Sequence, residues 1–277
     1  MKFLKHRMPK NDWGDRIVSF YLFVTTLKRF PSKHKKLFND ELYRLKLSDE
    51  ISDPLRIFVS DKEYVKIYVR EKLGDCYNVP TDAVLHTSAE VDTFNFPPNC
   101  CIKGTHFSGA VIFSGDGKAI DRDKIKAWMR RNFYAFGRER NYKYLKRKII
   151  IEPLVFGTQN PTDYKFFCYN GEPKFLQADF DRHTDHCRIM YNLNWEPQPF
   201  TIRYPVSDRL YPKPANFDQM IAAARALSAD FKGFLRVDMY SDGQDIKIGE
   251  LTNVPGNAIG IFTPDDGEKL ASQLLFA

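Results

Sequence analysis

Apolar and polar positions alternate differently in the two parts of the chain. Residues 15–46 repeat apolar positions at helical spacing and predict helix. A second helix is predicted over SDKEYVKIYVREKLG (60–74), where Ser60 and Glu63 have capping-box spacing and Gly74 ends the pattern. Its apolar stripe consists of Val65, Tyr68, Val69 and Leu73. The first third of the chain is therefore predicted to be mainly helical.

After the proline-bearing connector FNFPPN (94–99), short apolar runs separated by turns predict strands. Single strands are expected at 100–103, 110–114 and 148–156, with a GDG turn at 115–117, and one further short strand at 83–86, before the connector. Hairpins are expected over 163–180, turned at Asn170-Gly171, and over 233–251, turned at Asp242-Gly243. Helices are expected at 121–136, capped by Asp121 and apolar on one face, and at 216–230. This order predicts an α+β fold with antiparallel hairpins and argues against a doubly wound Rossmann domain.

Charge adds a preference for anionic partners. The 277 residues carry a net charge of +7, and the basic stretches lie mostly in the first half. Basic residues mixed with aromatic ones at 130–148 resemble a nucleic-acid surface, but the apolar face of the predicted helix explains most of the aromatics. A solvated basic face and a working anion site both fit this charge.

Cysteine usage and hydropathy bear on the compartment. The five cysteines show no C-x-x-C spacing, which suggests neither zinc nor disulfides and fits reduced thiols in a cytosol. No signal peptide is visible. The apolar run at 17–27 is too short to cross a bilayer. It fits a buried helix, or alternatively an interfacial helix on an anionic membrane.

The segment CCIKGTHFSGAVI (100–112) suggests phosphate binding. A lysine at the end of a predicted strand, Lys103, precedes a loop bounded by Gly104 and Gly109. The order fits neither a Walker A loop, where the lysine comes last, nor the Rossmann fingerprint. His106 within this loop could donate a hydrogen bond to a phosphate or face solvent.

The last hairpin carries the second chemical signal. Arg236 and Asp238 are two residues apart and share one face of a strand, and Glu250 lies across the turn on the partner strand. Two adjacent carboxylates suggest a shared Mg²⁺, which prefers oxygen ligands. The alternative is a carboxylate pair neutralised by Arg236.

Taken in order, five features resemble the ATP-grasp superfamily, and more narrowly its TupA-like branch, which is linked to teichuronopeptide and capsular polysaccharide synthesis. They are the lysine before the glycine-rich loop, KIIIEPL, DYK, RVD and GELTNVPG. The resemblance covers about residues 60–265, and WEPQPF (195–200) is also similar. It implies an ATP-grasp fold in which two α+β lobes clamp ATP. The expected organisation is a mainly helical N-terminal region (1–95), a central lobe with the glycine-rich loop (96–147) and a C-terminal lobe with the metal-binding hairpin (148–277).

The resemblance also implies roles for individual residues. Lys103 would hold ATP phosphates under the lid 104–109, which includes Ser108, while Glu152, Leu154 and Val155 would line the adenine slot with Lys148 just upstream. Asp163 would contact the ribose and Lys165 the phosphates. Arg236 would face the acylphosphate, and Asp238 and Glu250 would bind Mg²⁺ or Mn²⁺. At the asparagine position of the usual E-x-N metal motif the chain has Thr252, with Asn253 one residue later, and either could complete the metal site.

The segment DRHTDHCR (181–188) is a weaker candidate. As a zinc site it lacks a fourth ligand, and Arg182 or His183 near the γ-phosphate or the acceptor fits it better.

The expected activity is an ATP- and Mg²⁺-dependent carboxylate–amine ligase that works through an acylphosphate. By resemblance, it would join a uronic acid of a surface polysaccharide or precursor to an amino acid or amino sugar, in the cytoplasm or at the inner face of the membrane. Nucleic acid is not an expected partner. The alternatives are a phosphotransferase on the same fold and a catalytically silent glycan-binding protein.

Overall fold

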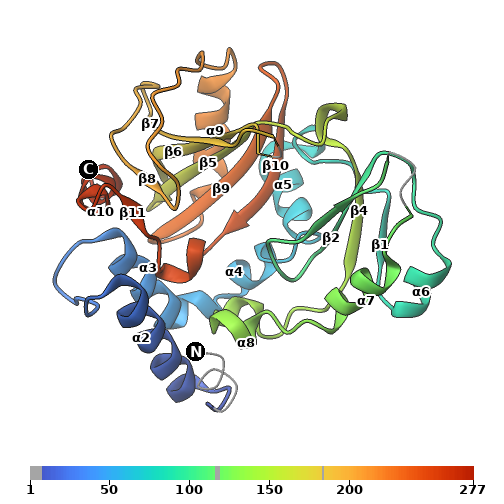
Figure 1. Ribbon diagram of the computed structural model, residues 1–277, viewed down its shortest axis with the longest axis horizontal. Helices are drawn as coiled ribbons and strands as arrows, with labels where there is room; N and C mark the ends of the chain where they lie inside the picture. Colours follow the sequence, from blue (N-terminus) through green and yellow to red (C-terminus); the bar gives the residue numbers. More distant parts are fainter. Residues whose placement is uncertain (1–7, 116–118, 183) are drawn as a thin grey trace.

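The computed structural model describes residues 8–115, 119–182 and 184–277. Two antiparallel sheets dominate it, one at the right of Figure 1 and one at the upper centre. A third, two-stranded sheet joins β8 (Thr201–Ile202) to β11 (Phe262–Thr263). The GDG turn predicted at 115–117 falls mostly outside the described residues. Among the described residues, no helix is long and apolar enough to cross a membrane.

The first sheet has the strand order β1-β4-β2-β3. Its strands are β1 (Ala83–Leu85), β2 (Cys100–Gly104), β3 (Val111–Phe113) and β4 (Ile149–Pro153). Helices α6 (Ser88–Thr93) and α7 (Arg122–Arg130) share a core with one face, which contains Ile102, Trp128 and Ile149. Because β1 precedes residue 96 and β4 follows residue 148, this sheet crosses both domain boundaries predicted from sequence.

The second sheet has the strand order β10-β9-β5-β6-β7. Its strands are β5 (Asp163–Tyr169), β6 (Glu172–Phe180), β7 (Cys187–Asn192), β9 (Phe234–Ser241) and β10 (Ile246–Thr252). Successive residues on a strand point to opposite faces, so Phe166 joins one core and Phe167 the other. One face is covered by α5 (Val65–Leu73) and α9 (Phe217–Ser228), and the other by α3 (Phe38–Leu47) and α10 (Gly267–Leu275). Burial on both faces explains the long apolar runs in β5 and β9.

The remaining elements are short, apart from α2 (Asp12–Leu27). They are α4 (Pro54–Val59), α8 (Tyr134–Gly137), η1 (Asp49–Ser52), η2 (Asp75–Tyr77), η3 (Arg140–Tyr142), η4 (Val155–Gly157) and η5 (Pro255–Ala258). Helices α2 and α3 lie at the lower left of Figure 1, and α4 lies nearer the centre. These elements complete the α+β architecture expected from the sequence.

Both predicted hairpins are confirmed. Asn170 and Gly171 have φ of 51° and 82°, the left-handed pair that a tight hairpin turn needs. The Asp121 cap is also confirmed, since its carboxylate accepts a hydrogen bond from the Lys124 amide at 2.9 Å. Gly74 ends α5 with φ of 96°. Local turn and cap chemistry was therefore a sound guide to these element ends.

Three helix predictions were wrong in their extent. The pattern over 15–46 is interrupted, because α2 ends at the left-handed residue Lys28 and α3 begins only at Phe38. The pattern over 121–136 is split between α7 and α8, and Phe136 is exposed. The capping box at 60–63 does not form, because the Ser60 hydroxyl donates to the Arg56 carbonyl oxygen at 2.7 Å and α5 begins five residues later.

Candidate active site

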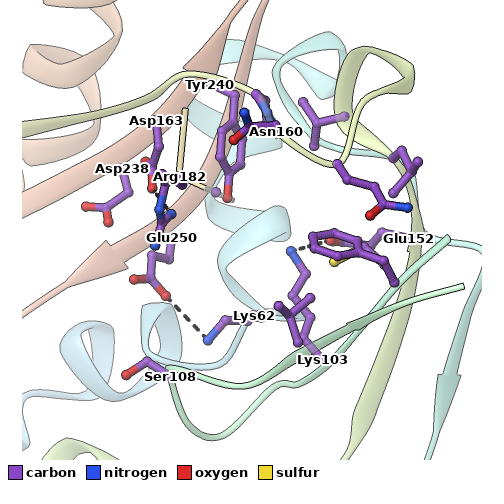
Figure 2. Close-up of a pocket in the computed structure, with 18 of the residues that line it drawn as sticks. Lys62, Lys103, Ser108, Glu152, Asn160, Asp163, Arg182, Asp238, Tyr240 and Glu250 are labelled. Carbon is purple, nitrogen blue, oxygen red and sulfur yellow. Dashed lines mark hydrogen bonds and ion pairs between the residues drawn. The ribbon is translucent and has the colours of Figure 1, made fainter. Parts of the chain in front are cut away.

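A cavity of about 410 Å³ lies between the two sheets, and both contribute to its walls. Figure 2 shows charged side chains entering it from opposite sides, with Lys103 and Glu152 on one side and Asp238 and Glu250 on the other. Twelve of the residues that the sequence assigned to the site line this cavity. They are Lys103, Ser108, Gly109, Glu152, Leu154, Val155, Asp163, Lys165, Arg182, Arg236, Asp238 and Glu250.

On the first-sheet side, a buried carboxylate is shared between two lysines. Glu152 of β4 lies 2.5 Å from the Lys103 Nζ of β2 and also pairs with Lys66, which comes from α5. Burial alone would raise the pKa of Glu152, but the two lysines outweigh it and lower the pKa. Lys103 is thus held by a strand neighbour, with its ammonium group at the cavity wall.

The loop after Lys103 contributes backbone and small side chains to the cavity. A Cβ on Gly104 would lie 2.0 Å from the Phe107 ring, so glycine at this position allows Phe107 to pack beneath the strand. Gly109 has φ of 83°, a backbone conformation that favours glycine. His106 does not line the cavity; it is buried, and burial lowers its pKa to about 4. A neutral, inward-facing His106 does not fit the predicted phosphate contact.

On the second-sheet side, the hairpin register brings the two predicted carboxylates together. Glu250 is directly opposite Asp238, and the ladder is shifted between Ile248 and Glu250. Arg236 donates to Asp238 through Nε and Nη2, each at 2.6 Å, and its Nη2 lies 3.5 Å from Glu250. The Thr252 hydroxyl is 3.3 Å from Glu250 Oε1 and accepts a hydrogen bond from Arg236 at 3.2 Å. The predicted arginine–carboxylate cluster is thus present as a geometric unit.

Strand β5 extends this cluster towards β6 and its following loop. Lys165 lies 3.2 Å from Asp238 and also pairs with Asp163. Arg182 pairs with the same Asp163 oxygen, Oδ2. The other oxygen of Asp163, Oδ1, is buried with no hydrogen-bond partner among the described residues. Asp163 therefore keeps an acceptor for a ligand donor.

The two central carboxylates differ in acidity. Burial opposes ionisation of Glu250, but Lys62, Arg236 and Lys165 outweigh it and lower its pKa to about 2. Burial raises the pKa of Asp238, and the neighbouring negative charge of Glu250 adds to that increase. Like charges in one site separate the pKa values of a pair in this way.

Two lysines of the site were not found by sequence reasoning. Lys62 lines the cavity, lies 3.4 Å from Glu250 and donates to the Phe107 carbonyl oxygen at 2.7 Å. Lys66 pairs with Glu152. Both belong to SDKEYVK, a segment from which no site residue was predicted. By helical spacing Lys62 and Lys66 fall beside the apolar stripe, in line with Val69 and Leu73, and two lysines at such positions were the signal that could have revealed them.

Five predicted site residues do not line the cavity: His106, described above, Thr252, which contacts Glu250, and Gly104, Lys148 and Asn253. Lys148 is buried against Asp61 at 3.1 Å and lies over the Tyr64 ring, 3.9 Å from its centroid. Asn253 is buried, accepts a hydrogen bond from Arg56 at 2.7 Å and donates to the Ser60 hydroxyl at 3.1 Å. Its amide therefore faces away from Glu250, and of the two candidates for the asparagine role only Thr252 is near the carboxylates. Gly104 acts through packing, as described above.

The DRHTDHCR segment contributes one side chain to the cavity and others to a buried ion-pair cluster outside it. Arg182 enters the cavity, whereas His186 and Arg188 bind the buried carboxylate of Asp179, with His186 Nε2 at 3.0 Å and Arg188 Nε at 2.6 Å. His183 lies outside the described residues. No cluster of three or more histidine, cysteine or acidic side chains suited to a metal is present in the described part of the chain.

Three oxygen donors of the last hairpin nevertheless suit a hard divalent cation. Asp238, Glu250 and Thr252 offer only oxygen, and they share one face of the hairpin. Mg²⁺ is commonly held by one or two carboxylates, with water and substrate phosphates completing the shell. Two carboxylates in a cavity that also presents cations to phosphates fit this pattern. We therefore keep Asp238, Glu250 and Thr252 as the candidate Mg²⁺ or Mn²⁺ ligands.

Similar solved structures include D-alanine–D-alanine ligase from Helicobacter pylori, at 18% identity and a TM-score of 0.40, with 79% of this chain covered. L-amino acid ligase from Bacillus licheniformis is similar at 13% identity and a TM-score of 0.46, with 90% of this chain covered. The chain spans 62% of the length of the first and 56% of the second. No curated protein matches the chain at a significant level.

The antiparallel sheets, the cavity between them and the order of charged positions along the chain define an ATP-grasp fold, as the sequence indicated. The family model described as TupA-like ATPgrasp matches residues 40–275, and the chain belongs to that family. The match begins 20 residues before the segment 60–265 that carries the resemblance, and the added part includes most of α3 and all of α4.

Proposed function

We propose that this protein is an ATP- and Mg²⁺-dependent ligase that joins a carboxylate to an amine through an acylphosphate. The observation that carries the proposal is the facing pair Asp238 and Glu250, which shares one cavity with Lys103 of the opposite sheet. Phosphoryl transfer to a carboxylate brings two anions together, so it needs fixed positive charge around the transferred group. The cavity offers such charge on both sides.

The nucleotide would bind across the cavity. Leu154, Val155 and the backbone beside Glu152 would form the adenine slot, and Lys103 would contact the phosphates beneath Ser108 and Gly109. Asp163 Oδ1 would accept a hydrogen bond from a ribose hydroxyl, which would satisfy its buried lone pairs. Lys62 and Lys165 would lie on the phosphate side. In this arrangement both sheets would contribute cations to the phosphates.

In the first step, a carboxylate oxygen of the substrate would attack the γ-phosphorus, and the bond from that phosphorus to ADP would break. In the second step, the amine nitrogen would attack the acyl carbon and release phosphate, with loss of a proton from nitrogen. Arg236 would stabilise the negative charge on the acylphosphate and on the tetrahedral centre. Bound Mg²⁺ would supply charge neutralisation at the phosphates, held by Asp238, Glu250 and Thr252.

For the substrate, we propose a carboxylate-bearing sugar, such as a uronic acid of a surface polysaccharide or its precursor, and an amino acid or amino sugar as the amine. The family resemblance supports this choice, and the net charge of +7 favours an acidic acceptor. We place the reaction in the cytoplasm, where ATP is available.

The proposal is tested by measuring ADP release from ATP in the presence of Mg²⁺. Each uronic acid of a panel is combined with each of a set of amino acids and amino sugars. The expected result is release that requires both a carboxylate and an amine. Asp238→Asn and Glu250→Gln should each lower turnover at least about a thousandfold, because ligands for the charge-neutralising cation are lost. Asp208→Asn, at an exposed carboxylate outside the cavity, is the matched control and should retain activity.

Other outcomes would replace the proposal. Full turnover in Asp238→Asn and Glu250→Gln would exclude the site. A stable phosphorylated product formed without any amine would identify a phosphotransferase instead. Failure of ATP with Mg²⁺ to raise the melting temperature would favour a catalytically silent glycan-binding protein. Thr252, which stands where the usual metal motif has asparagine, is the feature that supports this alternative.

A further inference from the structure

The outward side of α2 is apolar where an ordinary surface helix is polar. The side turned to the protein carries Val18, Leu22 and Phe23. On the other side, residues at intervals of four, three, four and three share one stripe, and all are large and apolar. The stripe consists of Trp13, Ile17, Phe20, Val24 and Leu27. None of the five is buried, and Trp13 is 62% exposed.

The loop after α2 continues this stripe. Phe30 is 72% exposed, and its ring stacks on that of Phe20 with centroids 5.9 Å apart. Two large rings therefore sit together on the outside of the molecule rather than in a core. Helix α2 lies at the lower edge of the molecule in Figure 1, away from both sheets. Contiguous exposed apolar surface of this kind usually marks an interaction site.

Positive charge surrounds the stripe. From residue 16 to residue 37 the sequence contains no acidic residue and six lysines and arginines. Five of the six are exposed: Arg16, Lys28, Lys33, Lys35 and Lys36. Arg16 and Lys28 flank the stripe within the helical periodicity, and the other three follow in the loop. The sixth, Arg29, pairs with Asp40 at 2.6 Å and with Glu268 at 2.8 Å, which attaches the loop to α3 and α10.

We propose that this α2 surface, made of the stripe, Phe30 and the five exposed cations, docks on an anionic lipid bilayer. Tryptophan and phenylalanine side chains partition into the head-group region, while lysine and arginine contact anionic lipids at the same depth. The helix would lie parallel to the membrane plane with its inner side still packed on the protein. The inference does not depend on the proposed ligase activity, because no residue of the α2 surface lines the central cavity.

A second copy of the chain is the competing occupant, since a four-three spacing is also that of a helix-pairing seam. The charges argue against it. A two-fold interface would place the same surface on both sides, so five cations of one copy would face five of the other with no acidic residue of the segment between them. An anionic bilayer neutralises the same charges, and we therefore favour the membrane.

Vesicle binding by the full chain tests the proposal. We expect sedimentation with vesicles that contain phosphatidylglycerol to be at least about tenfold stronger than with phosphatidylcholine alone, and to weaken as salt is added. Intrinsic fluorescence should shift to the blue on binding. Trp13→Phe should abolish that shift, because Trp128 is buried and Trp195 is packed against the second-sheet core.

Two sets of variants distinguish the apolar and the charged contributions. Phe20→Ser with Phe30→Ser should lower vesicle binding at least about tenfold, since two inserting rings are lost. Its control is Leu210→Ser, at a side chain that is 82% exposed elsewhere. Lys33→Glu, Lys35→Glu and Lys36→Glu together should also lower binding at least about tenfold. Their control is Lys124→Glu, Lys232→Glu and Lys269→Glu, an equal change of net charge at exposed lysines elsewhere.

Two results would overturn the inference. One is binding to anionic vesicles that the control triple lowers as much as the loop triple does, which would show only a response to net charge. The other is a stable dimer in sedimentation velocity that Phe20→Ser with Phe30→Ser converts to monomer, while the native chain shows no vesicle binding. That second result would assign the α2 surface to a second copy.

Discussion

The two walls of the cavity hold their charges in different ways. On the first sheet, the single carboxylate Glu152 is shared by Lys103 and Lys66, which leaves an excess of positive charge. On the second-sheet side, three carboxylates that line the cavity are interleaved with three cations. They are Asp163, Asp238 and Glu250 with Lys165, Arg182 and Arg236.

This difference indicates that the two walls are suited to different ligands. A wall with excess positive charge is suited to an anion such as a phosphate chain, whereas a balanced wall with adjacent carboxylates can accept a divalent cation. The balanced wall is also more interdependent, because Lys165 alone lies within 4.0 Å of Asp163, Asp179 and Asp238. A change on this wall should therefore affect folding as well as binding, and a change on the first wall mainly binding.

The largest expected effect is that of Lys165→Met on stability. The substitution leaves buried Asp163 and Asp238 with less compensating charge, and breaking such a network typically costs about 3–5 kcal/mol. Urea unfolding followed by circular dichroism measures the loss. Lys103→Met should cost less, because Glu152 keeps Lys66 as a partner. If Lys103→Met proved the more destabilising, the contrast between the two walls would be wrong; exposed Lys124→Met is the control.

The second test is the fall in the free energy of unfolding at acid pH. Because the folded-state pKa of Glu250 is lowered from 4.5 to about 2, its stabilising contribution is complete above the unfolded value and is lost as the pH falls towards 2. With allowance for its partial exposure, that contribution should be about 2 kcal/mol. Glu250→Gln should therefore flatten the decline in unfolding free energy between neutral pH and this acid region. A decline as steep as in the control Glu71→Gln, at an exposed position, would exclude this origin.

Nucleotide affinity is the third test and concerns the first wall. Lys103→Met should weaken ATP binding at least about tenfold, equivalent to about 1.4 kcal/mol, because a fixed cation next to the phosphates is lost. Titration calorimetry gives the affinity, and Lys103→Arg should restore part of it by keeping the charge. Unchanged affinity in Lys103→Met would show that the phosphates lie elsewhere in the cavity.

The smallest expected effect concerns the position where the usual asparagine is absent. Thr252→Val keeps the shape but removes the hydroxyl, and we expect turnover to fall only about two- to fivefold, less than 1 kcal/mol. Thr252→Ser should restore the activity. A loss of more than about a hundredfold in Thr252→Val would instead make the hydroxyl a required ligand on the second wall.

Sequence reasoning worked where the determining interactions are local. The pairing of Asp238 with Glu250 followed from strand alternation and one turn, and the structure places them opposite each other. It failed for Asn253, whose side chain is turned inward by Arg56 of α4, 197 positions away in the chain. It also missed Lys62, which by helical period falls in line with the apolar stripe and meets Glu250 only through the tertiary fold.

The position of Lys62 has a consequence for how the cavity responds to ligands. Its ammonium group contacts the Phe107 carbonyl oxygen in the glycine-rich loop and Glu250 on the opposite wall. A ligand that takes over either contact changes the free energy of the other, and this coupling acts equally in both directions. Nucleotide and metal ion should therefore not titrate independently in this protein, and the affinity measured for one will depend on the concentration of the other.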